Sequence, residues 1–172
     1  INVLGVATVH TKNSLSSKKS LLIKSFGLIS LIKFGSNYLF NKGYDLTDLF
    51  FKGKLLKNKR SVRALTKKYN IPLKRVQDVN SIVFKEYLNK LELDLIVSFS
   101  APSIFKEELL SIPRKGCINL HCSYLPKYSG ILPSFWVLFN DEKETGVTIH
   151  FMDSHIDNGK IISQEKVKID EN

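Results

Sequence analysis

The stretch at residues 116–130, GCINLHCSYLPKYSG, most constrains what this chain can fold into. It begins as an apolar segment with a β-branched residue and ends in turn-forming residues, a pattern typical of a buried strand that runs into a loop. If residues 117–121 form a strand, alternation places Cys117, Asn119 and His121 on one face. An amide and an imidazole then stand side by side near the carboxyl end of a strand, where open α/β sheets have their active sites.

Asn119 and His121 have the chemistry for reaction at a carbonyl-like centre. An asparagine amide can donate a hydrogen bond to a developing oxyanion, and a histidine can move a proton near neutral pH. The alternative is a polar strand end whose two side chains only cap a turn, and the residue types alone do not decide between these interpretations.

A second polar stretch, GVTIHFMDSHIDNGKII, follows at residues 146–162. We expect a strand at residues 147–152, a loop at residues 153–159 that is rich in turn-forming residues, and a further apolar segment after it. Asp157 in this loop could orient or ionise His121, as a third group orients the base in triad chemistry. Taken alone, an Asp-Asn-Gly sequence is more typical of an ordinary turn.

Alternating strand and helix patterns predict a parallel sheet with crossover helices. The clearest strand is DLIVSF at residues 94–99, a continuous apolar run of the kind found in buried parallel sheets. With 172 residues, the chain is long enough for one domain with a real core. The other expected elements are an apolar strand within residues 1–9, a short strand at 71–76, and helices at 61–69, 82–91 and 102–110.

Residues 11–60 are interpreted as a basic, partly apolar insertion in this domain. The apolar stretch at residues 21–40 is interrupted by lysines and glycines, too often for a transmembrane helix. We expect an amphipathic helix packed on the domain. The alternative is a helix lying on a membrane surface, because lysines flank the apolar face; stable membrane insertion is not expected.

The positive charge of the chain is concentrated in its first half. Residues 1–80 contain 16 Lys and Arg against 3 Asp and Glu, whereas residues 81–172 contain 10 against 13. This asymmetry can mark an anionic partner such as a tRNA, and a solvated lysine-rich surface would give the same numbers.

The positions of the cysteines and histidines indicate a protein of a reducing compartment, without a metal site. Cys117 and Cys122 fall on opposite faces of the expected strand and cannot readily pair, which is typical of a cytoplasmic protein. No Cys/His cluster has zinc spacing, and His150 and His155 are interpreted as surface residues or as supports for the catalytic ones. A G-x-G-x-x-G fingerprint is absent, which argues against a nicotinamide enzyme.

Several motifs follow one another in the second half of the chain. Their residues are Asn119, His121, Ser123, Leu125, Pro126, Gly130, Pro133, Trp136, Gly146, Val147, Thr148, Ile156, Asp157 and Gly159. In this order they resemble the catalytic half of the folate-dependent formyltransferases, a family that includes methionyl-tRNA formyltransferase, glycinamide ribonucleotide transformylase and the sugar-nucleotide N-formyltransferases. The resemblance is dense at residues 93–162. Two departures are Ser129, where many members carry an Arg before the glycine, and Ser154-His155, where a small or acidic pair is usual.

The resemblance implies a Rossmann-like, mostly parallel α/β fold and transfer of a formyl group from 10-formyltetrahydrofolate to a primary amine, without a metal. Asn119, His121 and Asp157 match the catalytic trio of the family, and Ser123 and Gly130 are expected to contact the acceptor. The donor is expected in a pocket made largely of backbone, at Val97, Ser98, Phe99, Ile104, Leu125, Pro126, Met152 and Asp153.

The acceptor amine remains open among methionyl-tRNA, an amino-sugar nucleotide and glycinamide ribonucleotide, which the family is known to use. The rival interpretation is a non-catalytic basic binding protein, or a membrane-surface interaction protein, on the same fold. The complete catalytic trio argues against lost catalysis. Because the sequence starts at Ile1 directly in an apolar strand, we expect a fragment of a formyltransferase domain that lacks the first strand and helix of the family.

Overall fold

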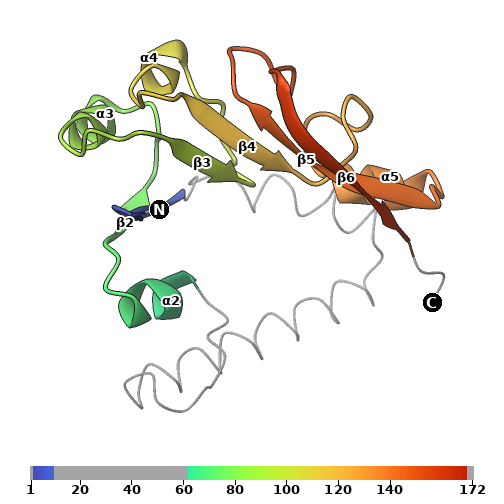
Figure 1. Ribbon diagram of the computed structural model, residues 1–172, viewed down its shortest axis with the longest axis horizontal. Coiled ribbons are helices and arrows are strands. Elements are labelled where there is room, and N and C mark those ends of the chain that lie inside the picture. Colours follow the sequence, from blue (N-terminus) through green and yellow to red (C-terminus); the bar gives the residue numbers. More distant parts are fainter. Residues whose placement is uncertain (1, 10–61, 170–172) are drawn as a thin grey trace. The chain divides into compact units, whose positions relative to one another are not determined.

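The computed structural model describes residues 2–9 and 62–169 (Figure 1). The chain divides into two compact units, residues 1–77 and residues 78–172, each with its own sheet; the single domain expected for residues 1–172 stays a prediction. The helix expected within residues 21–40 and most of the basic first half lie outside the described residues. Among the residues that are described, no helix has the length and apolar character needed to cross a membrane.

The first unit contains a pair of parallel strands and a helix. β1 (Val6–Val9) pairs with β2 (Leu73–Val76), and α2 (Val62–Lys68) precedes β2. The chain leaves α2 through Asn70, whose φ of 53° lies in the left-handed region, where asparagine is found more often than most residues. The strands and the helix predicted around these positions are confirmed.

The second unit is built on a four-stranded sheet in the order β3–β4–β5–β6 (Figure 1). The strands are β3 (Ile96–Phe99), β4 (Cys117–His121), β5 (Glu144–Phe151) and β6 (Ile161–Lys168). β3 and β4 are parallel as predicted, whereas β5 and β6 continue the sheet antiparallel. The loop between β5 and β6 is too short for a crossover connection, so these two strands can pair only in the antiparallel sense.

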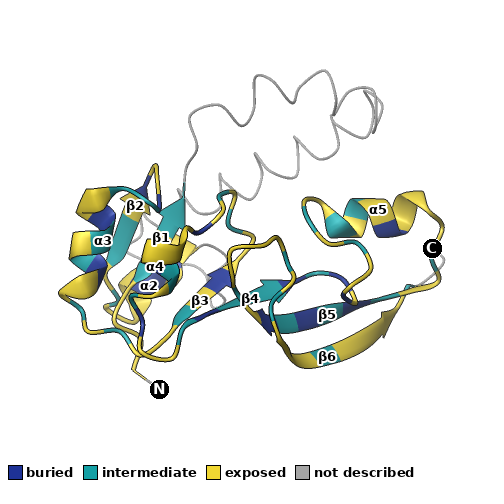
Figure 2. Ribbon diagram, turned by 90° about the horizontal axis from the view of Figure 1, so that it is seen from above, coloured by how far each residue is buried: buried dark blue, intermediate teal, exposed yellow. Residues whose placement is uncertain are grey.

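Three helices accompany this sheet within the described residues: α3 (Ile82–Asn89), α4 (Glu107–Leu110) and α5 (Pro133–Phe139). α3 and α4 each bury apolar residues on one side and leave the other side exposed (Figure 2). Phe84 and Leu88 of α3 and Leu109 of α4 belong to the core. Full burial of one such side chain stabilises a fold by about 1.5–3 kcal/mol.

α4 begins at Glu107, whereas the sequence pattern predicts a helix from residue 102. The side chain of Asn80 explains the difference. Its amide donates to the Ile104 carbonyl and its Oδ1 accepts the Lys106 N–H, both at 2.9 Å. These bonds hold the segment in a non-helical conformation, with Lys106 extended at φ −77° and ψ 160°.

The loop that follows β4 is fixed by Thr148, in the middle of β5. The Thr148 side chain is fully buried, and its hydroxyl donates to the Ser123 carbonyl at 2.7 Å and accepts the Leu125 N–H at 3.1 Å. Gln164 of β6 donates to the same hydroxyl oxygen at 3.0 Å and to the Leu125 carbonyl at 2.8 Å. Because buried polar groups need partners, these bonds determine where the loop leaves the sheet.

Gly159 allows the loop between β5 and β6 to fold back on β5. A Cβ atom at this position would lie 1.8 Å from the carbonyl oxygen of Phe151, a separation that no side chain tolerates. The start of the same loop is tied to β4, because the Met152 N–H donates to the Cys117 carbonyl at 2.8 Å. Glycine is therefore required at 159 by the close approach of two backbone segments.

We predict that Gly159→Ala destabilises the protein by about 1–3 kcal/mol, the usual cost of forcing extra atoms into filled space. The added methyl group has to displace the backbone of Phe151, so strain is the cause. Thermal unfolding followed by circular dichroism measures the effect, with Asn158→Ala at the exposed neighbouring position as the control. Equal melting temperatures for the two variants would contradict the close approach.

Candidate active site

Asn119 and His121 lie on one face of β4, as alternation predicts, and each pairs with a polar residue of β5. The register places Asn119 opposite His150 and His121 opposite Thr148, with Ser98 of β3 on the other side of Asn119. Residues that pair across neighbouring strands point to the same face. His121 and His150 are buried, at 6% and 2% exposure, and their ring centroids are 6.5 Å apart.

Asp157 joins this cluster from the loop between β5 and β6. Its φ of 48° is left-handed, which costs a non-glycine residue on the order of 1–2 kcal/mol. Its Oδ2 accepts the Gly130 N–H at 2.7 Å and lies 3.5 Å from Nδ1 of His121, and its Oδ1 lies 3.5 Å from Nε2 of His150. The carboxylate is therefore directed at a distant loop and at both imidazoles, which an ordinary turn residue would not do.

Backbone carbonyls determine which nitrogen of each histidine carries the proton. His121 Nε2 lies 2.9 Å from the Tyr128 carbonyl oxygen, and His150 Nδ1 lies 2.8 Å from the Phe151 carbonyl oxygen. A carbonyl oxygen only accepts hydrogen bonds, so these two nitrogens are the donors. The opposite nitrogens carry no proton when the rings are neutral, and both face Asp157.

The geometry consequently leaves a place for one more proton between Asp157 and the two rings. An ionised Asp157 faces two imidazole lone pairs, which is unfavourable in a buried site. The amide of Asn119, 3.4 Å from Nε2 of His150, satisfies one of them. A proton between Nδ1 of His121 and Asp157 relieves the other and creates a charge-assisted contact. An arrangement that holds one mobile proton suits general acid–base chemistry.

The residues of β3 that are predicted to bind the donor lie on both faces of the sheet. Val97, Phe99 and Ile104 are 66%, 65% and 61% exposed. Alternation along β3 places Val97 and Phe99 on the face opposite to Ser98, which is buried beside Asn119. Of the three predicted residues in β3, only Ser98 therefore shares the face of the catalytic candidates.

The other predicted donor contacts lie on the two loops. Leu125 is buried, whereas Pro126, joined to it by a cis peptide bond, is exposed. Met152 is half-buried beside Cys117 at the start of β4, and Asp153 is exposed. The structure does not gather the eight predicted residues at one point, and their joint role stays a prediction.

Ser123 and Gly130, the predicted acceptor contacts, hold the loop together. Ser123 is 0% exposed, and its hydroxyl donates to the Lys127 carbonyl at 2.7 Å. In this structure the hydroxyl has no exposed surface, and its contact with the acceptor stays a prediction. Gly130 uses its N–H for Asp157 and has a φ of 89°, which favours glycine; its contact with the acceptor stays a prediction.

His150 is the site residue that sequence reasoning leaves undecided. Of the two alternatives, a surface residue or a support for the catalytic ones, the structure favours the second, since His150 is 2% exposed and contacts Asp157, whereas His155 is exposed. The local signal was the alternation that places Thr148 and His150 on one face. In the described part of the chain, no group of three or more His, Cys, Asp or Glu side chains is arranged to hold a metal ion.

Comparison with known proteins decides the family. The family model described as formyl transferase matches residues 52–172, most of the chain. The chain belongs to the formyltransferase family. The resemblance carried by Asn119, His121 and Asp157 is thereby confirmed at the level of the family.

Two curated relatives illustrate the similarity. The bifunctional polymyxin resistance protein ArnA of Wigglesworthia glossinidia brevipalpis is 46% identical over 111 residues, and the methionyl-tRNA formyltransferase of Staphylococcus aureus strain JH1 is 39% identical over 111 residues. Each alignment covers 64% of this chain, but 17% and 36% of the respective relative. The chain therefore spans only about a third or less of the length of these relatives.

Solved formyltransferase structures share the fold. Phosphoribosylglycinamide formyltransferase from Bacillus halodurans has a TM-score of 0.57 at 23% identity, covering 76% of this chain and 75% of that one. Glycinamide ribonucleotide transformylase 1 from Geobacillus kaustophilus has a TM-score of 0.56 at 26% identity, covering 64% and 62%. The Rossmann-like α/β class predicted from the sequence is confirmed.

Cys117 tests the placement of β4. Burial raises the pKa of its thiol from 9.0 to about 11, so its thiolate fraction at pH 8 is roughly a hundredfold below that of an ordinary thiol. We predict that iodoacetamide at pH 8 modifies the half-buried Cys122 and leaves Cys117 unmodified until denaturant is added. Peptide mass spectrometry gives the readout, and Cys122→Ser is the control. Similar labelling of both cysteines in the native protein would refute this placement.

Proposed function

We propose that this chain is the catalytic part of an enzyme that transfers a formyl group from 10-formyltetrahydrofolate to a primary amine. The observation that supports this proposal most strongly is the convergence of Asn119, His121 and Asp157, from one strand and one distant loop, in a chain of the formyltransferase family. An oxyanion donor and a proton-holding pair are what such a transfer requires.

In the proposed reaction, the amine nitrogen attacks the formyl carbon, and a new C–N bond forms as the carbonyl electron pair moves to oxygen. Asn119 donates its amide N–H to this oxyanion. The bond from the formyl carbon to the folate nitrogen then breaks, and that nitrogen takes up the proton that the amine gives up. Nδ1 of His121 and Asp157 carry the proton, directly or through a water held by Asp157, because Nε2 of His121 is bonded to the Tyr128 carbonyl.

The donor contacts at Val97, Phe99 and Ile104 are proposed through their backbone, because the side chains of Val97 and Phe99 lie on the face opposite to Ser98 and Asn119. The turn at Leu125 and Pro126, which is bonded to Thr148 and Gln164, would shape the entry to the site. In this proposal Ser98 supports Asn119 from the neighbouring strand.

The acceptor is proposed only as a primary amine, on methionyl-tRNA, an amino-sugar nucleotide or glycinamide ribonucleotide. The methionyl-tRNA formyltransferase relative makes methionyl-tRNA the first acceptor to test. We place the reaction in the cytoplasm, because Cys117 and Cys122 are both free thiols, as is usual in a reducing compartment.

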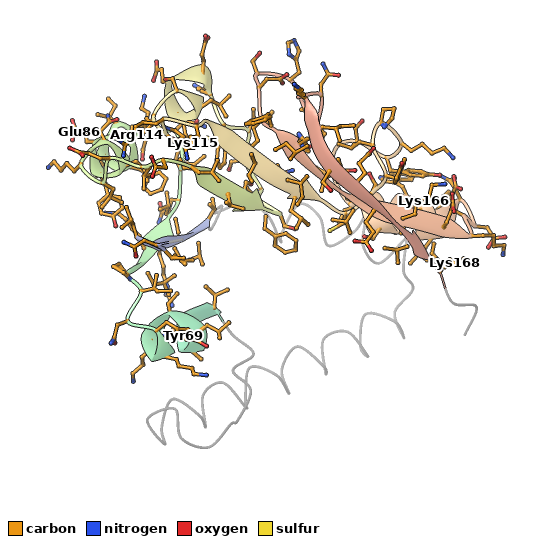
Figure 3. The ribbon with its side chains drawn as sticks, viewed as in Figure 1. Tyr69, Glu86, Arg114, Lys115, Lys166 and Lys168 are labelled. Carbon is orange, nitrogen blue, oxygen red and sulfur yellow. The ribbon has the colours of Figure 1, made fainter. Side chains whose placement is uncertain are left out.

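We predict that Asn119→Ala, His121→Ala and Asp157→Ala each lower kcat at least about a hundredfold. Removal of one oxyanion donor typically costs about 10²–10³, and an acid–base group contributes roughly 10²–10⁴. The assay follows release of tetrahydrofolate by the full-length enzyme with a panel of amine acceptors. Glu86→Ala, an exposed change on α3 (Figure 3), is the control. Near-normal turnover by His121→Ala would defeat the mechanism.

The same assay tests whether His121 and Asp157 act as one unit. Residues that act together give non-additive losses, so the His121→Ala/Asp157→Ala double variant is expected to be little worse than the worse single variant. Fully additive losses would leave the transfer chemistry standing and would show that the two side chains do not share a proton.

If tRNA is the acceptor, we predict that its binding to the full-length protein weakens steeply with salt. Each phosphate neutralised by Lys or Arg contributes a log–log slope of roughly −0.9 for duplex and about −0.7 for single strands. Titration of labelled tRNA across salt concentrations measures this slope. A flat dependence, or no binding at low salt, would remove tRNA and leave a small amine acceptor.

A further inference from the structure

The Tyr128 carbonyl, which determines the tautomer of His121, belongs to a residue with an unfavourable backbone conformation. Tyr128 has a φ of 57°, a region in which a non-glycine residue persists only when its surroundings hold it there. The same carbonyl oxygen lies 3.3 Å from the Ser123 hydroxyl, whose shorter bond is to Lys127. The Ser123 hydroxyl, shared with the Lys127 carbonyl, therefore gives this carbonyl only partial support.

The phenol of Tyr128 is held from two sides. Its O–H donates to Oε1 of Glu142 at 2.7 Å, and its oxygen accepts an N–H of the Asn140 side chain at 3.2 Å. Both partners lie in the connection between α5 and β5, and Asn140 directly follows α5. Lys127 Nζ, 3.5 Å from the same Oε1, adds an ion pair to Glu142.

The bond between Tyr128 and Glu142 is charge-assisted. The Tyr128 O–H and then the nearby Lys127 lower the pKa of the Glu142 carboxyl, while the Glu142 acceptor raises the pKa of the phenol. Glu142 is therefore ionised and Tyr128 neutral around pH 7, the combination that makes a strong O–H···O⁻ bond.

The Tyr128 side chain is only half-buried, so packing does not enclose it on all sides. The side chain lines a cavity of about 210 Å³, together with Glu142, Tyr124 and Lys166 of β6. A side chain with open space on one side is positioned mainly by its directional bonds. Removal of the phenol oxygen alone should therefore release it.

We propose that Tyr128, Glu142 and Asn140 form a bracket that holds the Tyr128 carbonyl within hydrogen-bond distance of Nε2 of His121. Nδ1 of His121, which faces Asp157, is thereby left as the nitrogen that exchanges protons. Tyr128 is a positioning residue, because it acts through its main chain and touches no reacting atom. The catalytic consequence rests on the proposed formyl transfer, whereas the effect on the imidazole does not.

Loss of the bracket has a defined chemical consequence. When the phenol is released, the carbonyl can rotate away and the neutral ring of His121 is no longer restricted to a proton on Nε2. The titratable groups that face this ring are Asp157 and His150, and both remain. A proton on Nδ1 would then be donated to Asp157 in the resting enzyme. The basic nitrogen would be Nε2, which faces the loop, so Nδ1 could no longer take up the proton from the amine.

Nitrogen NMR of the imidazoles in the full-length protein tests the bracket without any assay of activity. We expect the neutral His121 of the wild type to carry its proton on Nε2 and Tyr128→Phe to give a mixture of tautomers. The imidazole signal that disappears in His121→Asn is the signal of His121. Tyr124→Phe is the matched control, because it removes a phenol oxygen from the same cavity, where the Tyr124 ring faces Lys166.

Kinetics supply the second readout. A misplacement of about 1 Å can cost roughly a hundredfold in rate, so Tyr128→Phe should lower kcat about 10- to 100-fold with little change in KM. Glu142→Gln keeps an acceptor for the phenol and should retain most of kcat, whereas Glu142→Ala should resemble Tyr128→Phe. If Tyr128→Phe fails to fold, the difference in kcat between Glu142→Gln and Glu142→Ala tests the bracket in its place.

An unchanged His121 tautomer in Tyr128→Phe, or a kcat equal to that of Tyr124→Phe, would overturn the bracket. If the wild-type enzyme transfers no formyl group, the proposed function is wrong. The NMR comparison of the wild type with Tyr128→Phe would still decide whether the bracket exists.

Discussion

The hydrogen bond from the Gly130 N–H to the Asp157 carboxylate, 2.7 Å long, is the contact on which the rest of the site depends. It joins the loop after β4 to the loop after β5, two segments that are remote in sequence. With Asp157 held there, the carboxylate lies within 3.5 Å of a nitrogen of both His121 and His150. A loop carboxylate that would otherwise be solvated thus becomes the centre of a buried proton-holding cluster.

Two side chains of β5 support the site: one binds the loop after β4, and the other belongs to the cluster around Asp157. Thr148 binds the loop that carries Ser123 and Leu125, and two residues further along His150 enters the cluster. Both side chains point to the same face because the side-chain period of a strand is two. One strand therefore positions the loop and supplies a member of the site, so a slip of its register by one residue would remove both.

The sequence predicts the parts of this site that depend on local pattern. β4 and its Asn119/His121 face follow from alternation within five residues, and the loop that bears Asp157 follows from its turn-forming composition. His150 could not be placed, because its position depends on the antiparallel register between β4 and β5, a property of two strands together. The late start of α4 could not be predicted for a similar reason, because it depends on hydrogen bonds from the side chain of Asn80, which is distant in the sequence.

The backbone supplies most of what surrounds the two histidines. Each ring donates to a carbonyl, of Tyr128 or of Phe151, and Asp157 accepts a main-chain N–H. Main-chain groups are the same for every residue except proline, so a loop side chain that makes none of these bonds can vary while the proton geometry is kept. This accounts physically for Ser129 at a position where many formyltransferases carry arginine: no bond that orients His121 or Asp157 uses the side chain at 129. What the loop must preserve is its path, and that path depends on the left-handed residues Tyr128 and Gly130.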